Sequence, residues 1–207
     1  ELGPEVAPPF VLGCFEDIAP WYLVSTLESL RASFPSIPFE GREGRFSNLA
    51  TDLAQGRADI VISYDIGFEG KFDRRKITEI QPVAFLAVDH PLSGRSSVEI
   101  EDLISYPLIL STEDLSEGFI RNLFNDSKLV PNISHRATSL EMMRSMAAHG
   151  VGVGLSYSHP PSDVSYDGKP ILTVPIRSPQ ARADIMLLWS GLRASDPQFD
   201  KILDALM

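Results

Sequence analysis

Side chains that can bind a small polar molecule occur at the points where predicted β-strands end. Carboxylates accept hydrogen bonds, hydroxyls donate and accept them, and a guanidinium can bind a carboxylate through two parallel N–H bonds. In parallel sheets, ligands bind beyond the carboxyl ends of the strands, where helix N-termini offer unpaired N–H groups. The candidate binding residues are Phe15, Glu16, Asp17, Gly44, Arg45 and Tyr64 in the first half, and Ser111, Thr112, Thr138, Ser139 and Tyr157 in the second.

Several of these residues also have a purely structural interpretation. Asp17, Ser47 and Thr138 could serve only as helix N-caps, because short polar side chains accept hydrogen bonds from the first free N–H groups of a helix. Phe15 and Tyr64 could be core aromatics. Arg45 could point into solvent instead of binding a carboxylate. The case for a binding site depends on the convergence of these residues.

No pattern in the sequence predicts catalysis, a metal or a cofactor. The chain contains no GxxxxGK[ST], GxSxG or HExxH motif, and Cys14 and the four histidines lack metal-ligand spacing. The run from Gly150 to Gly154 follows a predicted helix and precedes a predicted strand, which is the reverse of the dinucleotide-binding order. We therefore expect a binding protein and not an enzyme.

The elements that must position the first candidates form a βαβαβ unit. Strands are predicted at 10–14, 37–40 and 60–63. Between the first two, Leu23, Leu27, Leu30 and Phe34 have helical spacing. A second helix is predicted to begin with Ser47 as N-cap and to end at Gly56. The uninterrupted apolar run of the third strand is typical of a parallel sheet that is covered on both faces.

The second half repeats this order. A strand at 82–88 breaks at 89–91, where we expect the chain to cross between lobes. Strands at 108–110, 133–136 and 153–155 then alternate with helices at 117–125 and 138–150, the latter opened by Thr138 and Glu141 at capping-box spacing. A loop over 156–169, strands at 171–175 and 185–189, and a terminal helix with Asp196 as N-cap follow.

The amino-acid composition limits the kinds of partner that this chain is expected to bind. The 207 residues carry a formal net charge of −10, which opposes contact with nucleic acid or an anionic membrane. The basic run Lys71, Arg74, Arg75 and Lys76 is interpreted as a solvated loop. No stretch has the length and hydrophobicity of a membrane span, and a single cysteine is compatible with a reducing cytoplasm. We expect a cytoplasmic protein that contacts no membrane.

Four segments resemble the effector-binding domain of LysR-type transcriptional regulators, in order and at the expected separations. They are GCFEDIAPWYLVSTLESLRASFPSI from Gly13, LAQGRADIVISYD from Leu53, AVDHPLSGRSSVEIEDLISYPLILS from Ala87 and TSLEMMRSMAAHGVGVGLS from Thr138. The resemblance covers residues 10–207.

The resemblance implies an α/β, periplasmic-binding-protein-like fold of two Rossmann-like lobes with a ligand cleft between them. Residues 1–9 would be a linker, 10–87 and 189–207 lobe I, and 88–188 lobe II. It also implies a small-molecule inducer, a homodimer formed through this domain, a tetramer in the full-length protein, and DNA binding through an N-terminal winged helix-turn-helix outside this chain. The positions of the family's inducer pocket correspond here to residues 15–17, 44–47, Tyr64, Ser111, Thr112, Thr138 and Ser139. Tyr157 is a candidate only because it follows a predicted strand.

One departure from the family suggests the ligand's chemistry. Family members often have small hydroxyl residues after the first strand, where this chain has Phe15, Glu16 and Asp17. We therefore expect an inducer with a donor or positive group that meets Asp17, and a carboxylate that faces Arg45.

Two other functions remain open at this stage. One is a periplasmic solute-binding protein of a transporter, with the chain as a processed mature protein. The other is an enzyme of the prephenate-dehydratase-like or deaminase-like type built on this fold, which would need a ligand-facing nucleophile or base with a partner.

Overall fold

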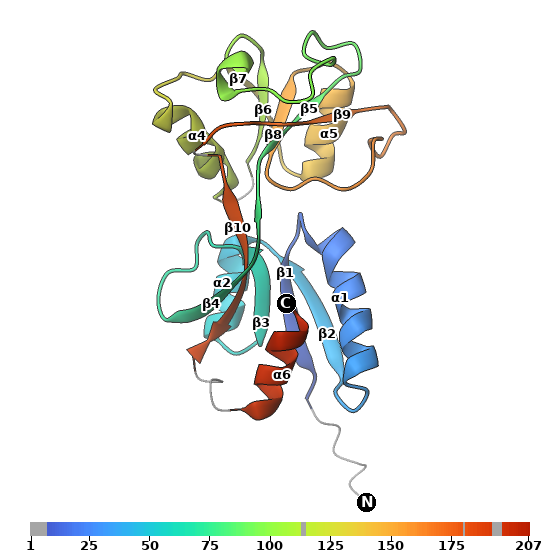
Figure 1. Ribbon diagram of the computed structural model, residues 1–207, viewed down its shortest axis with the longest axis vertical. Helices are drawn as coiled ribbons and strands as arrows, with labels where there is room; N and C mark the ends of the chain where they lie inside the picture. The colour runs from blue at the N-terminus through green and yellow to red at the C-terminus, as the bar shows by residue number, and fades with distance from the viewer. Residues whose placement is uncertain (1–7, 113–114, 180, 192–195) are drawn as a thin grey trace, which may run out of the picture. The chain divides into compact units, whose positions relative to one another are not determined.

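The computed structural model describes residues 8–112, 115–179, 181–191 and 196–207, and the chain divides into two compact units (Figure 1). Unit 1 comprises residues 1–78 and 184–207, and unit 2 comprises residues 79–183. Each unit contains one five-stranded sheet with helices against it. Of the predicted linker, residues 1–7 lie outside the described residues.

Unit 1 contains the predicted βαβαβ order. Its sheet has the strand order β2-β1-β3-β10-β4, with β1 parallel to both β2 and β3 and β10 antiparallel to β3. The elements are β1 (Phe10–Phe15), α1 (Ala19–Ser33), β2 (Phe39–Gly44), α2 (Phe46–Ala54), β3 (Ile60–Tyr64), β4 (Phe72–Ile80), β10 (Ala183–Ser190) and α6 (Pro197–Ala205). All five residues of β3 are buried, as its apolar run predicts.

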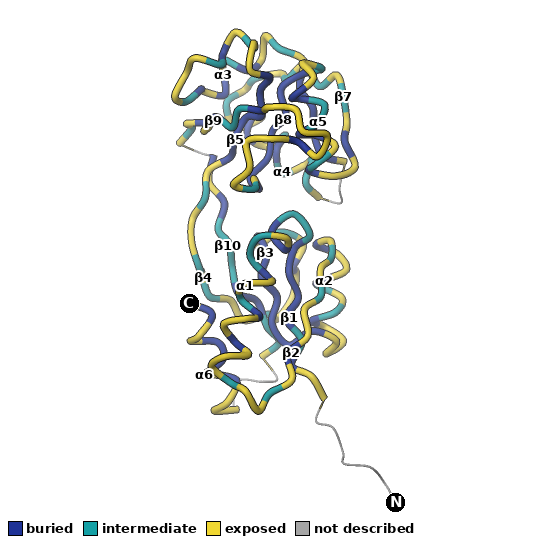
Figure 2. The backbone as a smooth tube through the Cα atoms, turned by 90° about the vertical axis from the view of Figure 1, so that its right-hand side faces the viewer, coloured by how far each residue is buried: buried dark blue, intermediate teal, exposed yellow. Residues whose placement is uncertain are grey.

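Helices cover both faces of the unit 1 sheet. A side chain at Gly41 would meet Leu23 and Leu27 of α1, whereas a side chain at Gly13 would meet Leu49 of α2. Phe10 of β1 lies 6.0 Å from Phe199 of α6 between ring centroids, on the α1 face. Figure 2 shows β1 and β3 as buried segments between these helices.

Unit 2 repeats the arrangement around a sheet of order β7-β6-β8-β5-β9. Strand β6 is parallel to β7 and β8, and β5 is antiparallel to β8 and β9. The elements are β5 (Val83–Leu86), α3 (Ile100–Leu103), β6 (Leu108–Ser111), α4 (Ser116–Asp126), β7 (Ile133–Ala137), α5 (Leu140–Ala148), β8 (Val153–Ser156) and β9 (Leu172–Pro175). The second βαβαβ unit, β6-α4-β7-α5-β8, is therefore confirmed.

The predicted lobe boundaries differ from the division seen here. The expected first crossing near residue 88 would place the strand at 83–86 in the first lobe, but β5 pairs with β8 and β9 of unit 2. The divisions lie at Thr78/Glu79 and at Ala183/Asp184 instead. The difference arises because strand β4 was not predicted. This strand takes the chain across the first boundary before β5 begins.

Most of the basic run expected as a loop lies in β4: Arg74, Arg75 and Lys76 belong to the strand, and Lys71 immediately precedes it. Charged side chains that alternate along a strand next to acidic neighbours can form ion pairs while the backbone stays in the sheet. Arg75 pairs with Asp204 at 2.7 Å, and Lys76 pairs with Asp184 at 2.6 Å. No local signal in the sequence predicted this strand, because these acidic partners are distant in the chain.

Two predicted helix starts were displaced. Helix α2 begins at Phe46 with Arg45 at the N-cap position, so Ser47 lies inside the helix. Helix α5 has Ser139 and not Thr138 as its N-cap, because the Ser139 hydroxyl accepts the N–H of Met142 at 3.2 Å. The terminal helix has the predicted cap: Asp196 accepts the N–H of Gln198 at 2.9 Å.

Candidate functional site

The first group of candidate residues comes together at one edge of the unit 1 sheet. Parallel strands β1, β2 and β3 end there at Phe15, Gly44 and Tyr64, and the register pairs Phe15 with Gly44. The Glu16 N–H donates to the Gly44 carbonyl at 3.0 Å, which fixes the loop after β1 against the end of β2. We call residues 15–17, 44–45 and 64 the carboxyl edge of unit 1.

An aromatic cluster underlies this edge. The ring of Phe15 stacks on Phe46 at 4.1 Å between centroids and meets Tyr64 edge-on at 5.7 Å. Phe15 is only 1% exposed and Tyr64 4%. The Phe15 ring therefore packs into the core of unit 1 and presents little surface to a ligand. Phe46 was missed, although an aromatic residue at a helix start beside a strand end was a usable signal.

A charged pair lies beside the aromatic cluster. Arg45 Nε lies 3.5 Å from Glu16 Oε1, with the two side chains 50% and 33% exposed. Partial burial raises the pKa of Glu16 above its ordinary value; Arg45 opposes this shift and Glu43 adds to it. Asp17 follows Glu16 in the chain and is half-buried. The N-cap position of α1 belongs to Ile18, so Asp17 is not the cap of that helix.

The second group lies at the corresponding edge of the unit 2 sheet, where β6, β7 and β8 end. The register pairs Ser111 with Ala137, and the Thr112 N–H and hydroxyl both donate to the Ala137 carbonyl, at 2.9 and 3.3 Å. Ser111 is buried, while Thr112, Thr138 and Ser139 are exposed. We call residues 111–112, 138–139 and 157 the carboxyl edge of unit 2.

Tyr157 completes this second edge. It follows β8 directly, is 6% exposed and packs on Phe119 of α4 at 4.9 Å between ring centroids. Burial raises the pKa of the Tyr157 phenol, so the hydroxyl stays protonated and can donate a hydrogen bond at physiological pH. The neighbouring Ser158 N–H donates to the Ser156 hydroxyl at 3.0 Å. Sequence reasoning missed Phe119 as part of this edge because it was assigned to the helix core.

Metal ligands and nucleophilic thiols are side chains that could support bond-making chemistry. Within the described part of the chain, no group of three His, Cys, Asp or Glu side chains could hold a metal ion. Cys14 is fully buried in β1, and burial together with the charge of Glu43 raises the pKa of its thiol to about 12. The same described residues include no helix long and apolar enough to span a bilayer. What the two edges offer is hydrogen-bonding groups and charges.

Comparison with protein families gives one match over nearly the whole chain. The family described as the LysR substrate binding domain matches residues 5–207.

Curated relatives are transcription regulators. The regulator TtuA of Agrobacterium vitis is 29% identical over 145 residues, which are 68% of this chain and 48% of that protein. The dual regulator OxyR of Escherichia coli is 26% identical over 217 residues, covering all of this chain and 69% of OxyR. The match thus spans about half the length of the first relative and about two thirds of the second.

A solved structure supports the same fold. The LysR family regulator HinK from Pseudomonas aeruginosa superposes with a TM-score of 0.89 at 27% identity, covering 97% of this chain and 70% of that one.

Proposed function

Because the chain belongs to the LysR substrate-binding domain family, we propose that it is the effector-sensing part of a transcription regulator and binds a small-molecule inducer at its two carboxyl edges. The observation that carries this proposal is the convergence of the predicted polar residues within each unit. Phe15 and Tyr64, which are 49 positions apart, meet at one sheet edge in unit 1. Ser111 and Tyr157, which are 46 positions apart, lie at one edge in unit 2.

The residues at unit 1 define the chemistry of the ligand. Asp17 would accept a hydrogen bond from an amine or other donor, and Arg45 would bind a carboxylate in exchange for Glu16. A ligand with both groups, such as an amino acid or a related zwitterion, fits this pair best. Buried Phe15 contributes by supporting the edge.

The residues at unit 2 supply neutral hydrogen bonds. Thr112, Thr138 and Ser139 are exposed hydroxyls, Ser111 is a buried one, and the Tyr157 phenol stays protonated. Such groups orient a polar ligand without demanding a particular charge. We propose that they bind the part of the inducer that lies away from its ionic groups.

Signal transfer requires the inducer to distinguish two states of the protein. A ligand shifts an equilibrium only by its difference in affinity between the states. We propose that these states are two arrangements of the lobes or of a homodimer, which assembles further into a tetramer in the full-length cytoplasmic regulator. The change from one state to the other would be transmitted to an N-terminal winged helix-turn-helix, which would bind DNA.

Peroxide sensing is a function suggested by the names of several relatives, described as hydrogen peroxide-inducible genes activators. Peroxide reacts with thiolates, and this chain has one cysteine, whose thiol is buried with a pKa of about 12. One buried thiol cannot form an internal disulfide either. We therefore propose ligand binding, and not cysteine oxidation, as the signal.

Transport and catalysis are less well supported. The family match and the curated relatives concern transcription regulators, which does not favour a transporter's solute-binding protein. An enzyme would need a paired nucleophile or base at an edge, and the described residues there form hydrogen bonds and an ion pair only.

Calorimetry against a panel of amines, amino acids and aromatic acids tests the proposed ligand class. We expect a zwitterionic or amine-bearing compound to bind, and Asp17→Asn to weaken its binding about tenfold, the loss of one charge-assisted hydrogen bond. Binding of simple anions alone, unchanged by Asp17→Asn, would refute the assignment. Thr51→Ala, which removes an exposed hydroxyl bonded only to the Ser47 carbonyl of its own helix, is the matched control.

A further inference from the structure

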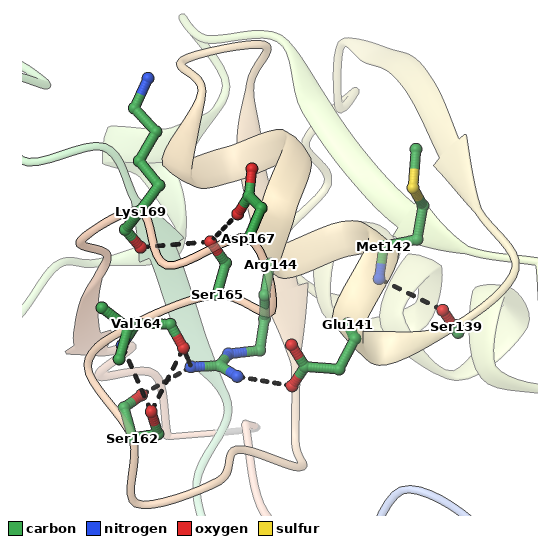
Figure 3. Close-up of polar contacts among 9 residues, drawn as sticks. All are labelled: Ser139, Glu141, Met142, Arg144, Ser162, Val164, Ser165, Asp167 and Lys169. Carbon is green, nitrogen blue, oxygen red and sulfur yellow. Dashed lines mark hydrogen bonds and ion pairs between the residues drawn. The ribbon is translucent and has the colours of Figure 1, made fainter.

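Arg144 is an almost completely buried charge in unit 2. Only 2% of its side chain is exposed, and it comes from the middle of α5. Its guanidinium donates to the Glu141 carboxylate one turn earlier and to the backbone carbonyls of Ser162 and Val164, the latter at 3.0 Å. Figure 3 shows the guanidinium between the Glu141 carboxylate and these carbonyls.

These contacts join a helix to a loop that has little regular structure of its own. Burial of a charge is unfavourable unless it is paired and hydrogen-bonded, so the loop carbonyls are part of what holds Arg144 in place. The Phe85 ring, 5.8 Å from the guanidinium carbon, lies against its face. Within the described residues, Arg144 Nε and Glu141 Oε2 have no hydrogen-bond partner, so the loop carbonyls and Glu141 Oε1 are the acceptors that bind this guanidinium.

The loop held in this way begins at the carboxyl edge of unit 2. It leaves β8 with Tyr157, runs along α5 past the Arg144 contacts, and is held again where His149 Nε2 lies 2.6 Å from Asp167 Oδ2. Arg144 therefore binds the loop five and seven residues after Tyr157. Displacement of residues 162–164 would free the segment that connects them to Tyr157.

We propose that Arg144 is a positioning residue of the effector site: by holding the loop 157–169 on α5, it sets the position of Tyr157 at the carboxyl edge of unit 2. The effect of Arg144 on inducer binding rests on the proposed function, because Tyr157 would contact the inducer. The effect of Arg144 on the position of the loop exists in the free protein and can be measured without a ligand. Arg144 would thus influence binding without touching the inducer.

Hydrogen–deuterium exchange of the whole chain tests this claim. In Arg144→Met, which keeps an unbranched side chain and removes the donors, we expect amides of residues 157–169 to exchange about tenfold faster or more, while β6, β8 and unit 1 keep their protection. If Arg144→Met does not fold, exchange is measured in Arg144→Lys instead. That variant keeps the positive charge and loses the two guanidinium NH₂ donors. Arg121→Met, which removes a surface arginine paired with Glu117 on α4, is the control.

NMR of the same variants reports on the side chains at the edge. The ring signals of Tyr157, assigned with Tyr157→Phe, should shift in the Arg144 variants and not in Arg121→Met. Desolvation lowers the pKa of His159, a hydrogen bond to the backbone of Pro160 opposes this, and the Arg144 charge lowers it further. The pKa of His159 should therefore rise in Arg144→Met, and a rise in Arg144→Lys would report changed surroundings, since the charge is kept.

Two outcomes would overturn the proposal. Unchanged exchange of residues 157–169 with unshifted Tyr157 signals would show that the loop holds its position without Arg144. Acceleration of similar size in both units would show a general contribution to stability and no positioning role. Either result leaves the proposed inducer function intact, because that function is tested separately by calorimetry.

Discussion

Arg45 Nε lies 3.5 Å from Glu16 Oε1 at the carboxyl edge of unit 1, so the arginine best placed to bind an inducer carboxylate is already paired within the protein. Both side chains are partly exposed, and an exposed ion pair contributes little to stability. An incoming carboxylate can therefore replace Glu16 at small cost. If the inducer binds at this edge as proposed, Glu16 competes with its carboxylate for Arg45.

Neutralising Glu16 should strengthen the binding of carboxylate ligands. In Glu16→Gln the competitor loses its charge, and we expect about twofold to fivefold tighter binding of the carboxylate-bearing compound found with the panel. Arg45→Met should weaken the same binding about tenfold or more. Calorimetry on both variants measures the two effects, and weaker binding to Glu16→Gln would contradict the competition.

The same pair predicts a pH dependence of binding. The pKa of Glu16 is raised by burial, so the folded protein disfavours its ionised form, and this contribution reduces stability as pH rises through that pKa. As pH falls through it, Glu16 is neutralised and Arg45 is released. Affinity for a ligand whose own carboxylate stays ionised should thus increase as pH falls from neutral through the pKa of Glu16. In Glu16→Gln this slope should disappear; an equal slope in that variant would assign the titration to another group.

Cys14 should be inert in the folded protein. Its thiol is fully buried and has a pKa of about 12, so almost no thiolate is present at neutral pH. Ellman's reagent should react only as fast as the protein unfolds, and peroxide at millimolar concentration should leave the mass and ligand affinity unchanged. Rapid stoichiometric labelling of the native protein would contradict this expectation and would favour oxidation of Cys14 as the signal.

Gly152 is required by close backbone approach in unit 2. A Cβ at this position would lie 2.6 Å from the Pro107 carbonyl oxygen, the acceptor of the Val153 N–H at 2.8 Å. Gly152→Ala must shift backbone and should lower the free energy of unfolding by about 1–3 kcal/mol. Urea denaturation measures this loss. The control is Gly94→Ala, where no atom lies within 4 Å of the added Cβ; equal stability of the two variants would refute the clash.

Sequence periodicity predicted the elements that positioned the site. Buried runs such as 60–63 and helical spacing such as Leu23, Leu27 and Leu30 were confirmed because burial on both sheet faces or on one helix face leaves a direct trace in residue order. The charged strand β4 left no such trace, since its side chains are compensated by residues distant in the chain, such as Asp204. Because β4 was not predicted, the first lobe boundary was expected at 87/88 and not at 78/79.

At the site, residue type alone could not separate packing from binding. Phe15 was expected at a ligand surface, but its ring packs on Phe46. Alternation along β1 places Phe15 on the same sheet face as Gly13, and α2 covers that face. Glu16 and Arg45 were both identified as candidates, but their mutual contact arises from the register of β1 against β2. The role of Arg144 depends on a loop path that no local pattern encodes.

The most direct test of the account is to map ligand-induced shifts in the ¹H–¹⁵N NMR spectrum of this chain with the tightest compound from the panel. We expect saturable shifts concentrated at residues 15–17, 44–45, 111–112 and 138–139, and smaller shifts at the opposite ends of both sheets. Shifts confined to the amino-terminal ends of the strands, or the absence of any saturable shift across the panel, would contradict effector binding at the carboxyl edges.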